Sequence, residues 1–150
     1  MRLVRIGTLR TPFGTVGECP RNGRQPDPAP GCLAVVDAAF RPGLLGLEGF
    51  SHLVLLYWLG PQGDGLEIVP PFDGQARGVF ATRAPLRPNP VGMSVVALDG
   101  VEGPGRLRVR YLDCVDGTAL LDIKPYLPST DAEPDAAMGW LAPHRTVRGA

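Results

Sequence analysis

Apolar residues in this chain form short runs that glycine and proline interrupt from one end to the other. No helical periodicity continues for three turns, whereas alternating or continuous apolar stretches recur, which is typical of strands. The pattern therefore predicts a mainly β fold. We expect strands at residues 3–9, 32–37, 50–59, 66–69, 78–82, 92–98, 106–112 and 119–123.

Two of these stretches have informative patterns. Residues 50–59 (FSHLVLLYWL) form a nearly continuous apolar run, which predicts a core strand buried on both faces. In residues 106–112, Leu107, Val109 and Tyr111 alternate with arginines, which predicts a half-buried strand with a solvated arginine face. So many short strands in one chain favour a small barrel or a sandwich.

Proline marks the segments that cannot form regular structure. Residues 18–31 contain four prolines and residues 84–90 (APLRPNP) contain three, so both are predicted to be loops. We expect one helical turn within residues 42–49. The end of the chain, residues 125–150, is rich in proline and aspartate and is expected to be irregular, apart from a helical turn near residues 135–141.

The length of 150 residues is that of a single domain, and a hydrophobic content of 44% argues against disorder. No apolar run approaches the roughly 18 to 20 residues that span a bilayer, and the N-terminus lacks the apolar segment of a signal peptide. We therefore expect a soluble, cytoplasmic protein without a membrane segment.

The charges are unevenly distributed, although the formal net charge is zero. Residues 77–98 contain three arginines and no acid, whereas residues 113–135 contain six acidic residues and the only lysine, Lys124. Arginine binds carboxylates, phosphates and nucleic acids, so this pattern permits a nucleic-acid partner without requiring one.

The motifs of several enzyme classes are missing. The chain has no GxGxxG, P-loop, HExxH or GxSxG sequence, which disfavours an ordinary Rossmann enzyme, a zinc protease and a serine hydrolase. Its three cysteines show neither CxxC spacing nor a nearby histidine pair. We therefore expect no metal site and no disulfide framework.

The segment 83–94 (RAPLRPNPVGMS) combines several constraints. Its prolines stiffen the backbone that presents Arg83, Arg87 and Asn89, so little ordering entropy remains to be lost on binding a ligand. Gly92 permits close approach of a ligand or of another backbone. From residue types alone, a rigid loop with solvated arginines is the simpler interpretation.

Two other polar segments are candidates. Asp116 and Gly117 form a strong turn signal, and Asp122 and Lys124 follow at a spacing that places them on one strand face. A hairpin with an ion pair and a functional site explain this segment equally well. Residues 18–24, with Arg21 and Asn22, form a third polar loop, whose arginines are just as simply solvated.

In these segments the chain resembles the TsaA-like family, which includes the TrmO tRNA methyltransferases. The similarity covers nearly the whole chain and is most specific in residues 87–94 (RPNPVGMS) and 116–126 (DGTALLDIKPY). The resemblance implies a small, non-Rossmann β-barrel over residues 1–130 that binds S-adenosylmethionine, followed by an irregular tail over residues 131–150. It also implies a homodimer.

The activity implied by the resemblance is methyl transfer to the N6 nitrogen of threonylcarbamoyladenosine beside a tRNA anticodon. Carried over residue by residue, the cofactor site contains Pro20, Arg21, Asn22, Leu59, Gly60, Arg83, Arg87, Asn89, Met93, Ser94, Asp116, Gly117 and Thr118. The acceptor nitrogen must lose a proton, so Asp122 is the candidate base, and Lys124 and Tyr126 are candidates to stabilise the carbonyl oxygen.

Two departures from the family pattern bear on function. Gly60 stands where a histidine often ends the core strand, and the longer tRNA-modifying members carry an extra C-terminal domain. A methyltransferase with a small-molecule acceptor and a non-catalytic module that binds S-adenosylmethionine are therefore the alternatives to a tRNA methyltransferase.

Overall fold

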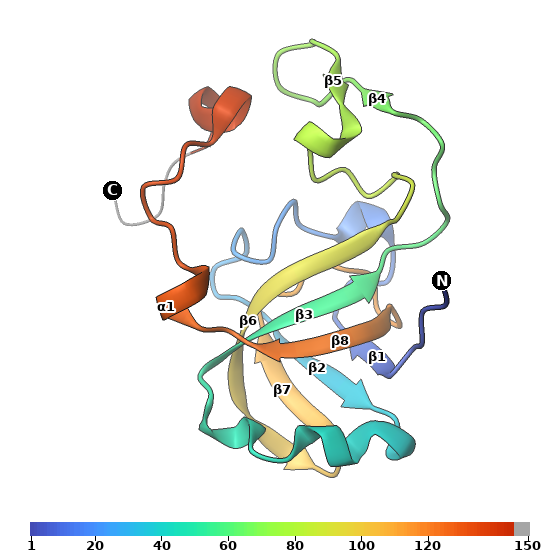
Figure 1. Ribbon diagram of the computed structural model, residues 1–150, viewed down its shortest axis with the longest axis vertical. Coiled ribbons are helices and arrows are strands. Elements are labelled where there is room, and N and C mark those ends of the chain that lie inside the picture. Colours follow the sequence, from blue (N-terminus) through green and yellow to red (C-terminus); the bar gives the residue numbers. More distant parts are fainter. Residues whose placement is uncertain (146–150) are drawn as a thin grey trace.

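The predicted short strands pair into a closed antiparallel barrel in the computed structural model, which describes residues 1–145 (Figure 1). The order around the barrel is β1-β2-β7-β6-β3-β8. The barrel strands are β1 (Gly7–Arg10), β2 (Gly31–Val36), β3 (His52–Trp58), β6 (Val91–Gly103), β7 (Arg106–Arg110) and β8 (Ala119–Pro125). The expectation of a small, mainly β, non-Rossmann barrel is confirmed.

The remaining elements are short and lie outside the barrel wall. Strands β4 (Glu67–Ile68) and β5 (Arg77–Gly78) pair only with each other. The helices are η1 (Val16–Glu18), η2 (Ala38–Leu44), η3 (Leu47–Gly49), η4 (Val79–Ala81), η5 (Gly139–His144) and α1 (Pro128–Asp131), all of them 3-10 helices except α1. Within residues 1–145, every helix is too short or too polar to cross a membrane.

The interior of the barrel is filled by aliphatic side chains from alternate positions of each strand. The largest fully buried ones are Leu9, Leu53, Leu55, Leu107 and Leu120. Burying a side chain of this size contributes about 1.5–3 kcal/mol, so this cluster accounts for much of the stability of the barrel. Strand β7 has the predicted alternation as far as Arg110, because Leu107 and Val109 are buried while Arg106 and Arg108 are exposed. The strand ends before Tyr111, which has φ +81° and does not continue the alternation.

Strand β3 differs from its prediction on one face. Leu53, Leu55 and Tyr57 are buried inside the barrel, as expected, but Val54 and Leu56 on the outer face are only partly buried. The prediction of burial on both faces is wrong for the outer face because a closed barrel has one interior, and here no second layer covers the outside of β3. An apolar strip therefore remains on the barrel wall.

Three other predictions from the sequence need correction. The first strand begins at Gly7 instead of residue 3, since Leu3 and Val4 are more than half exposed and pair with no strand. The strand predicted at residues 78–82 is mostly the 3-10 helix η4, because the backbone N–H of Thr82 donates to the Val79 carbonyl oxygen. Residues 38–49 form two 3-10 helices where one helical turn within residues 42–49 was expected.

The C-terminal part of the chain contains two short helices. Helix α1 follows β8 directly, and η5 replaces the helical turn that was expected near residues 135–141. Residues 146–150 of the expected tail lie outside the described residues.

The antiparallel order brings the long loops to one end of the barrel. Strands β1, β3 and β7 end there, and β2, β6 and β8 begin there. The loops at this end are residues 11–30, 59–90 and 111–118, and we call it the loop end. Helices η2 and η3 lie at the opposite end (Figure 1).

Gly92 is required by the packing of the barrel interior. It lies opposite Tyr57 in the β3–β6 register, and a Cβ atom at Gly92 would stand 2.2 Å from Cε2 of the Tyr57 ring. The close approach that this glycine permits is therefore made by a side chain of the protein itself.

We predict that Gly92→Ala destabilises the fold by about 1–3 kcal/mol, because the ring of Tyr57 is fully buried and must shift. Chemical unfolding measures this loss. Gly43→Ala is the matched control, because a Cβ atom at Gly43 meets nothing within 4 Å. Equal stability of the two variants would contradict the packing argument.

Candidate functional site

The proline-rich loop before β6 is braced by one of its own arginines. Arg87 Nη1 donates hydrogen bonds to the carbonyl oxygens of Thr82 (3.0 Å) and Ala84 (3.3 Å). The loop is also tied to residues 60–65, because the Gly63 N–H donates to the Arg87 carbonyl oxygen over 3.0 Å. The guanidinium of Arg87 thus holds the loop together and is not simply solvated.

Arg21 and Arg83 have a different environment. Both side chains are exposed, and within residues 1–145 neither guanidinium makes an ion pair or a hydrogen bond. Asn22 stabilises its own turn, since its Oδ1 accepts the Arg24 N–H over 2.9 Å. The two unpaired cations at the loop end are therefore available to an anionic group of a ligand.

A buried polar network lies beneath this surface. The Tyr57 hydroxyl oxygen lies 2.7 Å from Ser94 Oγ and donates to Asp113 Oδ1 over 2.8 Å. Ser94 is only 8% exposed and points into the barrel. Its hydroxyl group is therefore turned away from the outer surface, on which its neighbour Met93 lies half exposed.

Asp113 is a candidate site residue that sequence reasoning did not select. Burial raises the pKa of its carboxyl group, while the hydrogen bond from Tyr57 and the nearby charge of Arg83 act in the opposite direction. Burial and the charge of Asp113 also raise the pKa of Tyr57, which keeps this phenol protonated. The available signal was its position, directly after the strand predicted at residues 106–112.

The turn at Asp116 and Gly117 is confirmed. Gly117 has φ +86°, and Thr118 Oγ1 donates to the Val115 carbonyl oxygen over 2.6 Å. Asp116 is bound within the protein, because Oδ1 accepts the Thr11 N–H at 3.0 Å and Oδ2 pairs with Arg10 Nη2 at 3.0 Å. The hairpin interpretation is wrong, since the turn leads from β7 to β8 and these strands are not neighbours in the barrel.

Gly60 has a conformational reason to be glycine. Its φ is +132°, a region that side chains with a Cβ atom rarely adopt. The Leu59 N–H donates to the Pro90 carbonyl oxygen over 2.8 Å, which closes the end of β3 against the start of β6.

The candidate catalytic residues extend along β8, away from the loop end. Asp122 and Met93 both pair with Leu56 of β3, so the three residues form one row across the outer wall. The predicted ion pair is confirmed, with Lys124 Nζ 2.7 Å from Asp122 Oδ2. Tyr126 follows the last residue of β8, and its backbone N–H donates to the carbonyl oxygen of His52, at the opposite end of the barrel.

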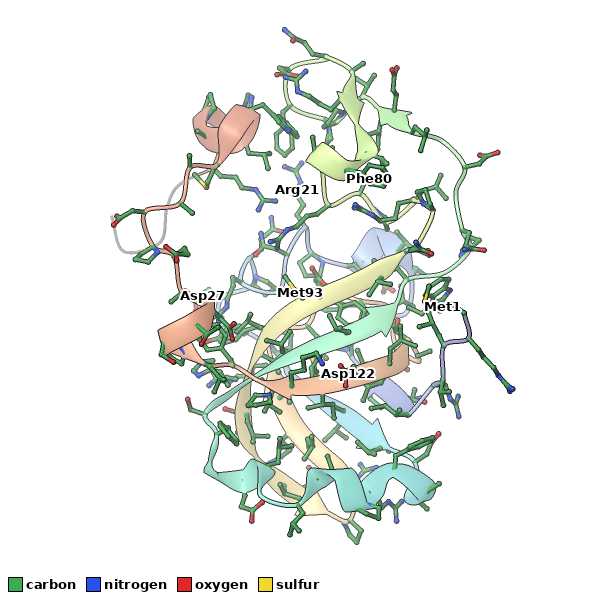
Figure 2. All side chains as sticks on the ribbon, in the orientation of Figure 1. Met1, Arg21, Asp27, Phe80, Met93 and Asp122 are labelled. Atoms are coloured by element: carbon green, nitrogen blue, oxygen red, sulfur yellow. The ribbon has the colours of Figure 1, made fainter. Side chains whose placement is uncertain are left out.

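The structure therefore brings together part of the predicted set. Figure 2 shows Arg21 above the strands, Met93 on the wall below it and Asp122 further down the wall. The loop end carries Pro20, Arg21, Asn22, Leu59, Gly60, Arg83, Arg87, Asn89, Asp116, Gly117 and Thr118. At about 3.3 Å per residue, Tyr126 lies about 23 Å along the chain from Ala119, the first residue of β8.

Other chemistries find little support in the described chain. Burial raises the pKa of Cys32 to about 11 and that of Cys114 to about 12, so both thiols are protonated and unreactive. In residues 1–145 no group of three or more His, Cys, Asp or Glu side chains is arranged to hold a metal ion. A shallow depression of about 620 Å³ outside β1, β2 and β7 contains Asp116 but no other predicted site residue.

Comparison with known proteins assigns the family. The sequence profile of the tRNA-methyltransferase O N-terminal domain matches residues 8–132. The chain belongs to this family. The predicted resemblance to TsaA-like and TrmO proteins is thereby confirmed.

The relatives differ in length. An S-adenosyl-L-methionine-binding protein of Archaeoglobus fulgidus is 43% identical over 87% of this chain and 93% of its own length. The tRNA (adenine(37)-N6)-methyltransferase of Escherichia coli is 39% identical over 91% of this chain, which spans 62% of that enzyme. The crystal structure of TrmO from Pseudomonas aeruginosa has a TM-score of 0.76 at 38% identity, with coverage of 93% of this chain and 61% of the other.

Asp113→Asn is predicted to change the pH dependence of stability. Because burial raises the pKa of Asp113 above its ordinary value of 3.8, the folded protein binds this proton more tightly than the unfolded chain. The stabilisation is complete below pH 3.8 and is lost as the pH rises through the raised pKa. The asparagine variant should therefore gain stability relative to wild type as the pH rises from about 4 towards neutrality.

Urea unfolding over a pH series measures this difference. Asp64→Asn is the control, because it removes an exposed carboxylate from the same end of the barrel. A stability difference between Asp113→Asn and wild type that is constant with pH would contradict the assignment.

Proposed function

We propose that this protein is an S-adenosylmethionine-dependent methyltransferase that acts on tRNA, at the N6 nitrogen of threonylcarbamoyladenosine next to the anticodon. The observation that carries the proposal is the family match over residues 8–132, together with relatives named as S-adenosyl-L-methionine-binding proteins and tRNA (adenine(37)-N6)-methyltransferases. A tRNA acceptor implies that the protein works in the cytoplasm.

The loop end carries both positive and negative side chains, which suits a cosubstrate with groups of both signs. S-adenosylmethionine has a carboxylate, an amino group and a positive sulfur, and it supplies the methyl group when bound. Arg21 and Arg83 are unpaired cations that suit its carboxylate. Asp113 is a partly buried carboxylate with a raised pKa, because the hydrogen bond from Tyr57 and the charge of Arg83 do not fully offset the cost of burying its negative charge. A positive group of the ligand beside Asp113 is therefore favoured.

The remaining cofactor-binding roles rest on the family pattern and the position of each residue. We assign Pro20, Asn22, Leu59, Gly60, Asn89, Gly117 and Thr118 to the lining of the pocket. Arg87 acts by holding the loop that presents Arg83. Asp116 and Ser94 use their side chains within the protein, so their backbone groups are the parts that remain for a ligand.

The acceptor needs a base, because an exocyclic N–H attached to a carbonyl group is a weak nucleophile until its proton leaves. We assign this role to Asp122. Its carboxylate lies on the outer wall, beside Lys124 and in the same row as Met93. Lys124 and Tyr126 stabilise the negative charge that builds on the carbonyl oxygen.

A homodimer brings together the two parts of this site, the loop end of one copy and the outer wall of β8 in the other. In the outer row of β8, β3 and β6, Met93 is half exposed and Leu56 is partly exposed, so beside Asp122 these two side chains form an apolar patch that a second copy can cover. In an isologous dimer whose two-fold axis lies in the plane of this face and runs perpendicular to the strands, the strand ends of the two copies exchange places. The Tyr126 end of each β8 then approaches the loop end of the other copy.

One observation favours a second candidate function. The Archaeoglobus fulgidus relative has nearly the length of this chain and is named only as a binding protein for S-adenosyl-L-methionine. A binding module, or a methyltransferase for a small acceptor, is the function to consider if tRNA is not methylated.

The first prediction for this function concerns Asp122. The wild-type protein should transfer labelled methyl groups from S-adenosylmethionine to bulk tRNA, and nucleoside mass analysis should locate them on N6 of threonylcarbamoyladenosine. Asp122→Asn should lower kcat about 10²- to 10⁴-fold with unchanged donor affinity by calorimetry.

Glu133→Gln is the control, because it removes one exposed carboxylate elsewhere on the chain. Unchanged methyl transfer by Asp122→Asn at saturating donor would remove the base assignment. Donor binding without label in RNA would favour the second candidate function.

The second prediction concerns the dimer. Leu56→Arg should give a monomer in analytical ultracentrifugation, because a long charged side chain in place of Leu56 prevents burial of this face. Val101→Arg, at an exposed apolar position on β6, is the control. A dimeric Leu56→Arg variant would show that the interface lies elsewhere.

Mixing tests whether the site is shared between copies. Arg83→Ala and Lys124→Ala should each be impaired, and an equal mixture, after subunit exchange, should recover about a quarter of wild-type activity, since half of the dimers hold one intact site. No recovery would mean that each copy works alone.

A further inference from the structure

Phe80 is the most exposed aromatic side chain in residues 1–145. It belongs to the 3-10 helix η4 and is 74% exposed, whereas its neighbour Val79 is 1% exposed. No element of the described chain covers this ring. Figure 2 shows it at the loop end, on the same side as Arg21.

The backbone beneath Phe80 is held in place on both sides. The Val79 N–H donates to the Leu66 carbonyl oxygen over 2.8 Å, and Thr82 Oγ1 donates to the Val79 carbonyl oxygen over 2.8 Å. On the other side of Phe80, the Ala81 carbonyl oxygen accepts the indole N–H of Trp140 over 2.8 Å. The ring is thus exposed on a fixed backbone, so little entropy is lost when something stacks on it.

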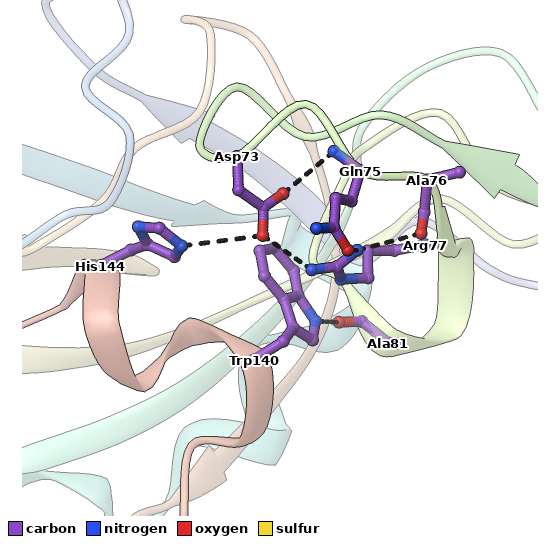
Figure 3. Close-up of polar contacts among 7 residues, drawn as sticks. All are labelled: Asp73, Gln75, Ala76, Arg77, Ala81, Trp140 and His144. Carbon is purple, nitrogen blue, oxygen red and sulfur yellow. Dashed lines mark hydrogen bonds and ion pairs between the residues drawn. The ribbon is translucent and has the colours of Figure 1, made fainter.

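Trp140 reaches η4 from a distant part of the sequence (Figure 3). Its ring lies 5.9 Å from the ring of Phe72 and under the guanidinium of Arg77, with Cζ 4.9 Å from the centroid. The ring of His144 stacks on Phe72 with centroids 5.2 Å apart, and Arg77 pairs with Asp73 over 2.7 Å. We call residues 139–144 the C-terminal strap, which lies beyond the family match at residues 8–132.

The charges nearest to Phe80 in sequence suit a polyanion, while Glu67 lies opposite Gly78 in the β4–β5 pair. Arg83 follows three residues after Phe80 and is unpaired, and residues 77–98 contain no acid. An exposed aromatic ring with an unpaired arginine near it is an arrangement with which proteins bind unpaired RNA bases, the ring stacking on a base and the arginine binding a phosphate.

We propose that Phe80 is a stacking platform for an unpaired base of the tRNA acceptor and that the C-terminal strap, through Trp140, holds this platform in position. The proposal rests on the proposed function. It assigns to the strap a part in acceptor binding and to Phe80 a contact that is independent of the methyl donor.

The test compares Phe80→Ala, Phe80→Leu and Phe80→Trp in the full chain. The alanine and leucine variants should bind bulk tRNA roughly 5- to 150-fold more weakly, with a matching rise in KM for tRNA, because both lose the stacking surface. Phe80→Trp should retain wild-type tRNA affinity. The affinity for S-adenosylmethionine should be unchanged in all three.

Leu45→Ala is the matched control, since it removes an exposed apolar side chain at the opposite end of the barrel and should leave tRNA affinity unchanged. A leucine variant that binds tRNA like wild type would overturn the stacking role. Weakened donor binding with normal tRNA affinity would overturn the stacking role and show that Phe80 contacts S-adenosylmethionine instead. A changed oligomeric state would overturn it and show that Phe80 contacts a second copy of the chain.

Trp140→Phe tests the strap, because it keeps an aromatic ring but removes the N–H that binds the Ala81 carbonyl oxygen. It should raise KM for tRNA more than it lowers kcat, and Phe80→Ala combined with Trp140→Phe should be no worse than Phe80→Ala alone. Additive losses would overturn the link between the two residues.

The wild-type assay separates this proposal from the one on which it rests. If wild-type protein neither binds nor methylates tRNA, both proposals fail. If it methylates tRNA and Phe80→Ala does so equally well, only the stacking platform is refuted.

Discussion

The buried side chain of Tyr57 connects the barrel core to the loop end. Its ring occupies the space that a Cβ atom at Gly92 would need, and its hydroxyl group contacts Ser94 and Asp113. Asp113 lies in the segment that leaves β7, so this one phenol holds a half-buried carboxylate at the edge of the candidate site. The position of that carboxylate therefore depends on core packing as well as on the loop that carries it.

Arginines of the same region have different tasks. Arg87 donates hydrogen bonds to the carbonyl oxygens of its own loop, and Arg77 pairs with Asp73 beneath the C-terminal strap. Arg83, between them in sequence, has no such partner in residues 1–145. The bound arginines make the segment rigid, and rigidity is what allows an unpaired arginine and an exposed ring to be presented without a large entropic cost.

Family membership and geometry together divide the proposed site into two surfaces. The loop end carries the unpaired cations and Asp113, while the outer wall carries Asp122, Lys124 and an apolar row. Within one copy the strand length separates these surfaces, and the isologous dimer that we propose would bring them together. The contribution that we propose for the C-terminal strap comes from a segment that the family match does not include.

The sequence by itself determined most of the strands, the turn at Gly117, the pairing of Asp122 with Lys124 and the family, because these depend on local periodicity, short spacing or a specific motif. The tertiary structure decided the rest. Met93 and Ser94 look equivalent in sequence, but strand alternation puts one outside and the other into the polar network. The contact of Trp140 with Ala81 joins residues 59 positions apart, and no local pattern encodes such a distant contact.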